Sequence, residues 1–133
     1  MDIELTKAEE KVMKILWSIK KGAIRDVVAQ YEGKKPAYTT VATILKILEG
    51  KKAVGRRPVA NSHEYFPLIE KSEYTRGYMK SFLGKYFSNS FKRLVSEFSS
   101  KGELSTEEMQ ELITHFQQQI EEKEKNENDK ANS

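Results

Sequence analysis

The sequence contains no cysteine and few of the residue patterns on which enzyme sites depend. Without cysteine the chain can form neither disulfide bonds nor a thiolate metal site, and a reducing compartment is expected. The two histidines, His63 and His115, have no nucleophile or carboxylate at the spacing of a catalytic triad or a metal site, and no glycine-rich phosphate loop occurs. We therefore predict that the protein is not an enzyme and requires neither a metal nor a cofactor.

Long hydrophobic runs are also absent. No stretch approaches the roughly 18 consecutive apolar residues of a membrane-spanning helix, and the N-terminus lacks the basic segment and apolar run of a secretion signal. The sequence therefore predicts a soluble, cytoplasmic protein. Its 133 residues, 38% hydrophobic and 32% charged, fit one small domain or a compact domain with a helical appendage.

The net charge of +3 is unevenly distributed along the chain. Residues 1–69 carry 13 Lys and Arg against 8 Asp and Glu, whereas residues 97–133 carry 4 against 10. A positive excess confined to the front half favours an anionic partner for that half. A solvated charged surface without a partner is the alternative.

Apolar spacing predicts three short helices, then two short strands, then three further helices. The first helix begins with a capping box formed by Thr6 and Glu9, and the last begins with a second one formed by Ser105 and Glu108. Between the strands, Ala60, Asn61 and Ser62 form the turn, where Asn tolerates tight geometry best. The expected elements occupy residues 6–20, 23–31, 38–50, 53–59, 63–68, 72–87, 91–98 and 105–120.

Three helices followed by a two-stranded ribbon are typical of a winged helix-turn-helix, whose third helix enters the DNA major groove. We predict a mainly α protein with a small β-hairpin: a winged-helix DNA-binding domain over residues 1–70, a C-terminal helical dimerisation region over residues 71–121, and a disordered polar tail over residues 122–133. The tail is expected to be disordered because a single alanine is its only apolar residue.

The third helix has a short polar face opposite its apolar one. Directing the apolar residues Val41, Ile44, Leu45 and Leu48 inward places a second set of residues outward, at spacings of three and four. A threonine hydroxyl can donate or accept a hydrogen bond, and its methyl group can contact a thymine methyl. Thr39 could instead be the N-cap of the helix. The predicted DNA-binding residues of this helix are Thr39, Thr40, Thr43 and Lys46.

Two arginines lie on the first strand of the predicted hairpin. Strand alternation sends Arg56 and Arg57 to opposite faces, so at least one should reach solvent, where it could bind a phosphate or a minor groove. By itself an arginine pair on a ribbon is often a solvated protector of a strand edge. The alternative to a DNA-binding protein is a winged-helix protein-interaction module that does not bind DNA specifically.

The C-terminal helices carry apolar stripes that are too large for short helices to bury alone. We therefore predict a homodimer, although the stripes could instead close a monomer core. A two-fold symmetric dimer would demand a roughly palindromic double-stranded DNA operator. The predicted dimer interface consists of Phe91, Leu94, Val95, Phe98, Leu112, Ile113 and Phe116.

The chain resembles the penicillinase-repressor family of bacterial winged-helix regulators, the BlaI/MecI/CopY group. The resemblance runs in order from about Leu5 to Ile113 and lies in "LTKAEEKVMKILW", "YTTVATILKILEGK", "HEYFPLI" and "SFLGKYFSNSFKRLVSEF", followed by "LSTEEMQEL". It implies a homodimeric repressor that binds inverted-repeat operators and is involved in the regulation of antibiotic resistance. Where many members have a basic residue after Lys46, this chain has Ile47, which leaves the operator sequence open.

The resemblance also bears on how the repressor is released. In the β-lactam-responsive branch, a membrane sensor-protease signals and the repressor is cleaved in its dimerisation region at an Asn-Phe bond. This chain keeps Phe98 but has Glu97 before it, so the resemblance implies a proteolysis site at Glu97 and Phe98. The copper-responsive branch binds metal through C-terminal cysteine pairs, and the absence of cysteine excludes that chemistry.

Overall fold

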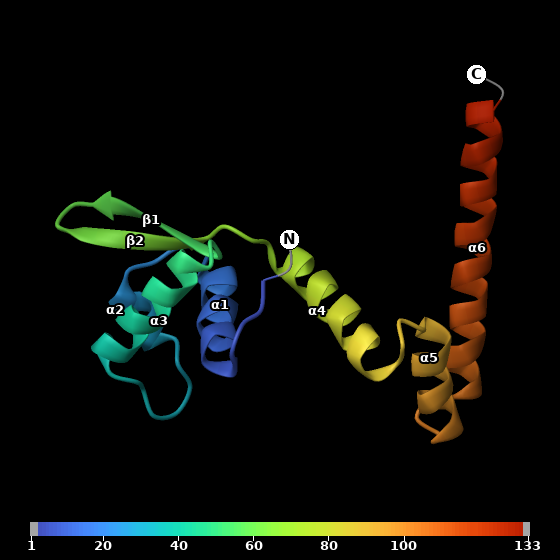
Figure 1. Ribbon diagram of the computed structural model, residues 1–133, viewed down its shortest axis with the longest axis horizontal. Coiled ribbons are helices and arrows are strands. Elements are labelled where there is room, and N and C mark those ends of the chain that lie inside the picture. Colours follow the sequence, from blue (N-terminus) through green and yellow to red (C-terminus); the bar gives the residue numbers. More distant parts are fainter. Residues whose placement is uncertain (1–2, 132–133) are drawn as a thin grey trace. The chain divides into compact units, whose positions relative to one another are not determined.

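The computed structural model describes residues 3–131 and is mainly helical with a two-stranded antiparallel hairpin, as predicted (Figure 1). The chain divides between Phe82 and Leu83 into two compact units, which are described separately. The elements are α1 (Lys7–Ile19), α2 (Ile24–Ala29), α3 (Tyr38–Gly50), β1 (Val54–Val59), β2 (Ser62–Pro67), α4 (Lys71–Tyr86), α5 (Phe91–Ser100) and α6 (Thr106–Ala131).

The first unit is a winged helix with one hydrophobic core. Helices α1, α2 and α3 contact one another, and the hairpin contacts all three helices through β1 or β2. Each helix turns its apolar stripe toward this core, as the periodicity predicted. The core residues are Val12, Met13 and Leu16 of α1, Val27 of α2, Val41, Leu45 and Leu48 of α3, and Ala53, Val54, Tyr65, Ile69 and Tyr74.

The hairpin is joined to the helices by a backbone bridge. In the hairpin register, Val54 pairs with Pro67 at one end and Val59 with Ser62 at the other. Gly22, between α1 and α2, forms an isolated antiparallel bridge with Tyr65 through two hydrogen bonds of 3.0 and 2.8 Å. At the turn, Ala60 and not Asn61 has left-handed backbone geometry, with a φ of 54°. The bridge fixes the root of the hairpin against the α1–α2 connection.

The start of α1 is tied to the end of α3 by a buried carboxylate. Thr6 is the N-cap and accepts a hydrogen bond from the Glu9 amide at 3.2 Å, as predicted. The Glu9 side chain, however, accepts from the Thr6 hydroxyl at 2.7 Å and from Lys51. Lys51 Nζ also donates to the Glu4 carbonyl at 2.9 Å. Burial raises the pKa of Glu9, but the hydrogen bonds and charge of Lys51 and the hydroxyl of Thr6 outweigh it and lower the pKa.

The first unit includes α4 as far as Phe82 and so extends beyond the expected boundary at residue 70. Tyr74 is buried in the core and its ring lies 5.7 Å from that of Trp17, measured between centroids. Its hydroxyl donates to Glu10 Oε2 at 3.0 Å. Burial, then the hydrogen bond and charge of Glu10, raise the pKa of Tyr74 to about 12. Sequence periodicity could not show this because the contact joins α4 to a helix more than fifty residues earlier.

The second unit contains α5 and α6 after the end of α4. Ser90 is the N-cap of α5, and its hydroxyl accepts a hydrogen bond from the Arg93 amide at 3.2 Å. The capping box predicted for the last helix is complete, because the Ser105 amide donates to Glu108 and the Glu108 amide donates to the Ser105 hydroxyl. None of the described residues of α5 or α6 is buried. In the single chain Leu83, near the end of α4, is the buried apolar residue described in this unit, while the apolar side chains of α5 and α6 are at most half-buried.

The predicted disorder of residues 122–133 is wrong for the part that the structure describes, since α6 remains helical to Ala131. Residues 132 and 133 lie outside the described residues. The segment is rich in Glu and Lys, which are good helix formers, and Glu121 precedes Lys125 at the favourable i,i+4 spacing. Low hydrophobicity argued against a packed core, but it does not prevent a solvated helix that continues from a capped one. Across residues 3–131, no helix has the length and hydropathy needed to cross a bilayer.

Candidate nucleic-acid interface

The exposed face of α3 carries the residues that the sequence predicted. Val41, Leu45 and Leu48 are completely buried, and Ile44 packs partly against the same core. This packing determines the rotation of the helix about its axis. The side chains brought together on the solvent face are those of Thr39, Thr40, Thr43 and Lys46. The structure confirms this orientation, while their contact with DNA remains a prediction.

Thr39 is not the N-cap of α3. The helix begins at Tyr38 after Ala37, which provides no side-chain cap, so Thr39 lies inside the first turn. The alternative structural role for Thr39 is therefore excluded. Because the first amides of a helix have no intrahelical partner, an uncapped N-terminus leaves donors that suit a phosphate oxygen.

Thr43 is held in one orientation by its own helix. Its hydroxyl donates to the Thr39 carbonyl, one turn earlier, at 3.0 Å. The bond occupies the hydroxyl proton and leaves the oxygen lone pairs and the methyl group facing solvent. In this state Thr43 can accept a hydrogen bond from a base amino group and can contact a thymine methyl without reorganisation.

Arg56 connects the hairpin to the end of α3. It pairs across the hairpin with Tyr65, and its guanidinium lies 3.3 Å from a carboxylate oxygen of Glu49. Half of the Arg56 side chain remains exposed. The ion pair was not visible in the sequence, because it depends on the angle between α3 and β1. The ion pair with Glu49 therefore connects the hairpin, which is the wing of this fold, to α3, the helix predicted to bind the major groove.

Arg57 lies on the opposite face of the hairpin, as strand alternation predicted. It pairs across the hairpin with Glu64, whose Oε1 accepts from Arg57 Nε at 2.9 Å and from Nη2 at 2.6 Å. The guanidinium also lies over the ring of Phe66, 5.7 Å from its centroid. Its side chain is 56% exposed, so a phosphate could approach it, but Glu64 would compete for the same donors.

The predicted dimer-interface residues form an apolar surface on the second unit. Leu94 and Leu112 are half-buried, whereas the others are exposed to solvent. A monomer core would bury these side chains, so closure of a monomer core is not what the single chain achieves. Large exposed apolar surfaces mark sites of association. The exposed members of the predicted set are Phe91, Val95, Phe98, Ile113 and Phe116, to which the structure adds Ile120.

The predicted proteolysis site lies within α5. The Glu97 carbonyl accepts from the Lys101 amide at 3.3 Å and from the Ser100 hydroxyl at 3.1 Å, and the Phe98 carbonyl accepts from the Glu103 amide at 3.0 Å. Both side chains are exposed. The peptide bond between them is helical, so a protease that binds extended chain must first unwind this part of α5.

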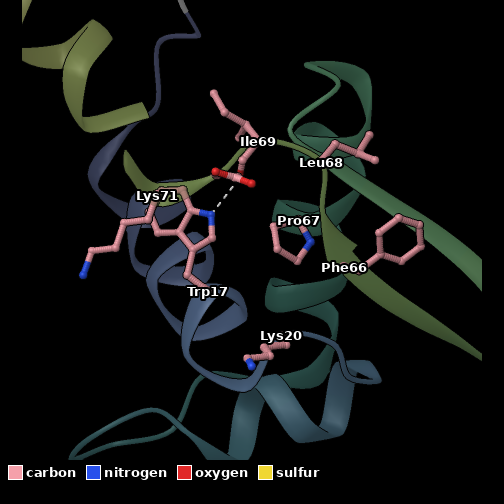
Figure 2. Close-up of a pocket in the computed structure, with 8 residues that line it drawn as sticks. Trp17, Lys20, Phe66, Pro67, Leu68, Ile69 and Lys71 are labelled. Atoms are coloured by element: carbon pink, nitrogen blue, oxygen red, sulfur yellow. Dashed lines mark hydrogen bonds between the residues drawn. The ribbon is translucent and has the colours of Figure 1, made fainter. Parts of the chain in front are cut away.

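An open groove of about 470 Å³ lies in the first unit where β2 leads to α4 (Figure 2). The indole of Trp17 points toward this connection and donates to the Ile69 carbonyl at 2.8 Å. Lys20 and Lys71 lie at its edges with the apolar side chains of Phe66 and Leu68. Within residues 3–131 no buried side-chain polar atom lacks a partner, and no cluster of acidic or histidine side chains could hold a metal. The groove offers no chemistry comparable with that of the α3 face.

The two histidines lie on different elements, His63 on β2 and His115 on α6. His63 pairs across the hairpin with Pro58 and is exposed. His115 lies on α6, with its ring 5.5 Å from the ring of Phe116, measured between centroids.

A sequence model of the penicillinase repressor family matches residues 5–118, which include the whole α3 face, the hairpin and α5. The chain belongs to the penicillinase repressor family. The methicillin resistance regulatory protein MecI of Staphylococcus aureus strain N315 is 28% identical over 110 residues, covering 82% of this chain and 89% of MecI. The penicillinase repressor of Bacillus licheniformis is 28% identical over 111 residues, covering 82% of this chain and 86% of that protein.

A solved structure is also similar to this member of the penicillinase repressor family. It is the solution structure of the monomeric form of Bacillus licheniformis BlaI in complex with the blaP half-operator. The two chains are 25% identical, with a TM-score of 0.46, and the match covers 53% of this chain and 88% of the BlaI chain.

Proposed function

We propose that the protein is a transcriptional repressor that binds a palindromic DNA operator as a homodimer. The observation that carries this proposal is the short polar face of α3, which is exposed on a packed winged-helix core in a member of the penicillinase repressor family. Relatives that this chain matches over 89% and 86% of their length are named as a methicillin resistance regulatory protein and a penicillinase repressor. Thr39, Thr40, Thr43 and Lys46 contact the major groove, and Arg56 and Arg57 contact the adjacent backbone.

The dimer is supported by the exposed apolar residues of α5 and α6. Each subunit binds one half-site, and the two-fold axis of the dimer matches the axis of the operator. Once one subunit is bound, the second binds at a high effective concentration, which raises affinity by roughly 10²-fold or more. Separation of the subunits therefore releases DNA without any change in α3 or the wing.

Selection of bound sequences from a random DNA pool tests this function directly. A repressor dimer should enrich an inverted repeat, and binding should weaken steeply as salt is added because phosphate contacts release counterions. A protein-interaction module would enrich no sequence and would show no such salt dependence. Failure to enrich an inverted repeat would therefore contradict the proposal.

Two substitutions should separate base contacts from phosphate contacts. Thr43→Ala should weaken binding by about fivefold per half-site and change the preferred base at one position. Arg57→Ala should weaken binding to all sequences. It should also reduce the slope of log affinity against log salt concentration by about the amount expected for one phosphate contact per subunit. Both effects can be measured by fluorescence anisotropy over a range of salt concentrations.

Glu64→Gln is the matched control for Arg57. It keeps the shape of the side chain but removes the carboxylate that occupies the Arg57 guanidinium. Binding to all sequences should become tighter, because Arg57 no longer leaves an ion pair to reach a phosphate. Unchanged binding in both Arg57→Ala and Glu64→Gln would remove this face of the wing from the DNA interface.

We further propose that proteolysis releases the repressor from its operator. A membrane-bound sensor-protease cleaves between Glu97 and Phe98, which divides α5 and removes its apolar stripe from the dimer. The exposure of both side chains supports access, and the helical hydrogen bonds of this segment make unwinding a requirement. Cleavage is then favoured by any signal that loosens α5.

Incubation of the protein with its cognate sensor-protease, followed by mass spectrometry of the fragments, tests this step. We expect two fragments that meet at Glu97 and Phe98, and faster cleavage of a Glu97→Asn variant, which restores the Asn-Phe pair implied by the family resemblance. If both chains stay intact, the bond is not the site of release. Cleavage of the variant alone would mean that Glu97 protects this repressor.

A further inference from the structure

Ile47 is an exposed aliphatic side chain on the helix that carries the polar face. It is 45% exposed, whereas Leu45 and Leu48 beside it are completely buried and Ile44 is half-buried. The residues packed against the core include Ile44 but not Ile47. Packing of the first unit therefore does not require a large apolar residue at position 47.

The spacing along α3 places Ile47 in the same stripe as two of the exposed threonines. Ile47 follows Thr43 by four residues and Thr40 by seven, which are the spacings of neighbours on one helix face. Around the helix axis, Ile47 lies between the directions of Thr40 and Thr43, one turn further along. It therefore belongs to the face that meets the DNA in the proposed function, flanked by Thr40 and Thr43.

An isoleucine at this position can recognise only part of what the major groove offers. It has no donor or acceptor for base edges, so it gains free energy by burying apolar surface. Among the major-groove edges of the four bases, only thymine presents a methyl group, at C5. A basic side chain at the same position would instead favour guanine or a phosphate.

We propose that Ile47 is a specificity-determining residue that contacts the C5 methyl group of one thymine in each half-site of the operator. The inference rests on the proposed DNA-binding function and specifies part of the sequence that the operator must contain. Loss of one buried methyl contact corresponds to about fourfold in affinity per half-site, and to about fifteenfold when both half-sites lose it.

Uracil provides the test, because it differs from thymine only by the missing C5 methyl group. The operator selected by the wild-type protein is resynthesised with uracil at one symmetric pair of thymines at a time. Binding of each DNA is measured for wild type, Ile47→Ala, Ile47→Val and the control Thr43→Ser, which removes a threonine methyl but keeps the hydroxyl. Because Ile47 is outside the core, the variants should retain the thermal stability of the wild type, which circular dichroism checks.

One symmetric pair should be sensitive to uracil through Ile47, and a pair that is sensitive through the Thr43 methyl should lose its sensitivity in Thr43→Ser and keep it in Ile47→Ala. At the Ile47 pair, the wild type and Thr43→Ser should each bind about fifteenfold more weakly to the uracil operator, Ile47→Val should show a smaller loss, and Ile47→Ala should bind both operators equally. Uracil sensitivity that persists in Ile47→Ala at every position, even where it disappears in Thr43→Ser, would overturn the inference. If a palindrome is enriched but shows no uracil sensitivity, only the inference on Ile47 is contradicted. If no palindrome is enriched, the proposed function itself is contradicted.

Discussion

Replacement of Lys51 with methionine is expected to cause a large loss of stability in the first unit. The variant leaves the Glu9 carboxylate, which is 5% exposed, without its cationic partner. Removal of one member of a buried pair typically costs about 3–5 kcal/mol. Because the Lys51 side chain is 35% exposed, we expect a loss of about 2–3 kcal/mol in the free energy of unfolding.

The pH dependence of stability should also change. In the wild type the folded pKa of Glu9 lies below its ordinary value of 4.5, so its contribution to stability is present above that value and is lost as the pH falls through the folded pKa. Without Lys51, burial is opposed only by the hydrogen bonds of Thr6, so the folded pKa of Glu9 should rise. The stability that Glu9 contributes above its ordinary pKa, and that is lost on acidification, should therefore shrink.

Urea unfolding followed by the fluorescence of Trp17, the only tryptophan, measures both effects. The double variant Glu9→Gln with Lys51→Met should recover much of the lost stability, because it removes the uncompensated charge. Lys52→Met, at the exposed neighbouring position, should change stability by less than about 0.5 kcal/mol. Equal losses in Lys51→Met and Lys52→Met, or a wild-type pH profile in Lys51→Met, would contradict the structural role of this pair.

Replacement of Phe98 with aspartate is expected to cause the largest loss of operator affinity. Phe98 is 45% exposed on the apolar stripe of α5, so a charge there should prevent burial of the stripe between two subunits with little effect on the single chain. Loss of the dimer removes the effective concentration of the second half-site and should weaken operator binding by roughly 10²-fold. Analytical ultracentrifugation and a parallel titration of full operator and half-site DNA measure the two effects.

A half-site provides the internal control for this variant. A monomer with an intact winged helix should bind half-site DNA as the wild-type subunit does, so a loss on both DNAs would point to misfolding. Ser96→Asp introduces the same charge on the polar side of the same helix, where the side chain is exposed, and should leave the dimer intact. A Phe98→Asp protein that sediments as a dimer would exclude this part of α5 from the interface.

Of the two capping boxes predicted from the sequence, only one forms completely. Ser105 and Glu108 form the reciprocal capping box expected from their spacing, because both side chains are exposed and have no stronger partner nearby. Thr6 and Glu9 have the same spacing, but Glu9 is buried and accepts from Lys51, so only half of the expected arrangement forms. A local motif determines its own hydrogen bonds only where the tertiary structure brings no competing charge.

The two arginines of the hairpin show a similar limit to what the sequence predicts about side-chain partners. Strand alternation correctly placed Arg56 and Arg57 on opposite faces, since side-chain direction in a strand has a period of two. Their partners depend on other elements: Glu64 on the register of the hairpin, and Glu49 on the approach of α3 to β1. The sequence predicted that at least one arginine would reach solvent and could bind a phosphate, whereas in the fold each is already paired with a carboxylate.

By itself the sequence determined the order of the elements, the buried face of α3 and the polar surface opposite it, because these follow from the spacing of apolar residues within single helices and strands. Tertiary structure alone decided which distant groups meet. The bridge of Gly22 with Tyr65, the buried pair of Glu9 with Lys51 and the position of Tyr74 in the core each join segments more than forty residues apart. Local periodicity carries no information on such contacts, because they depend on how whole elements pack.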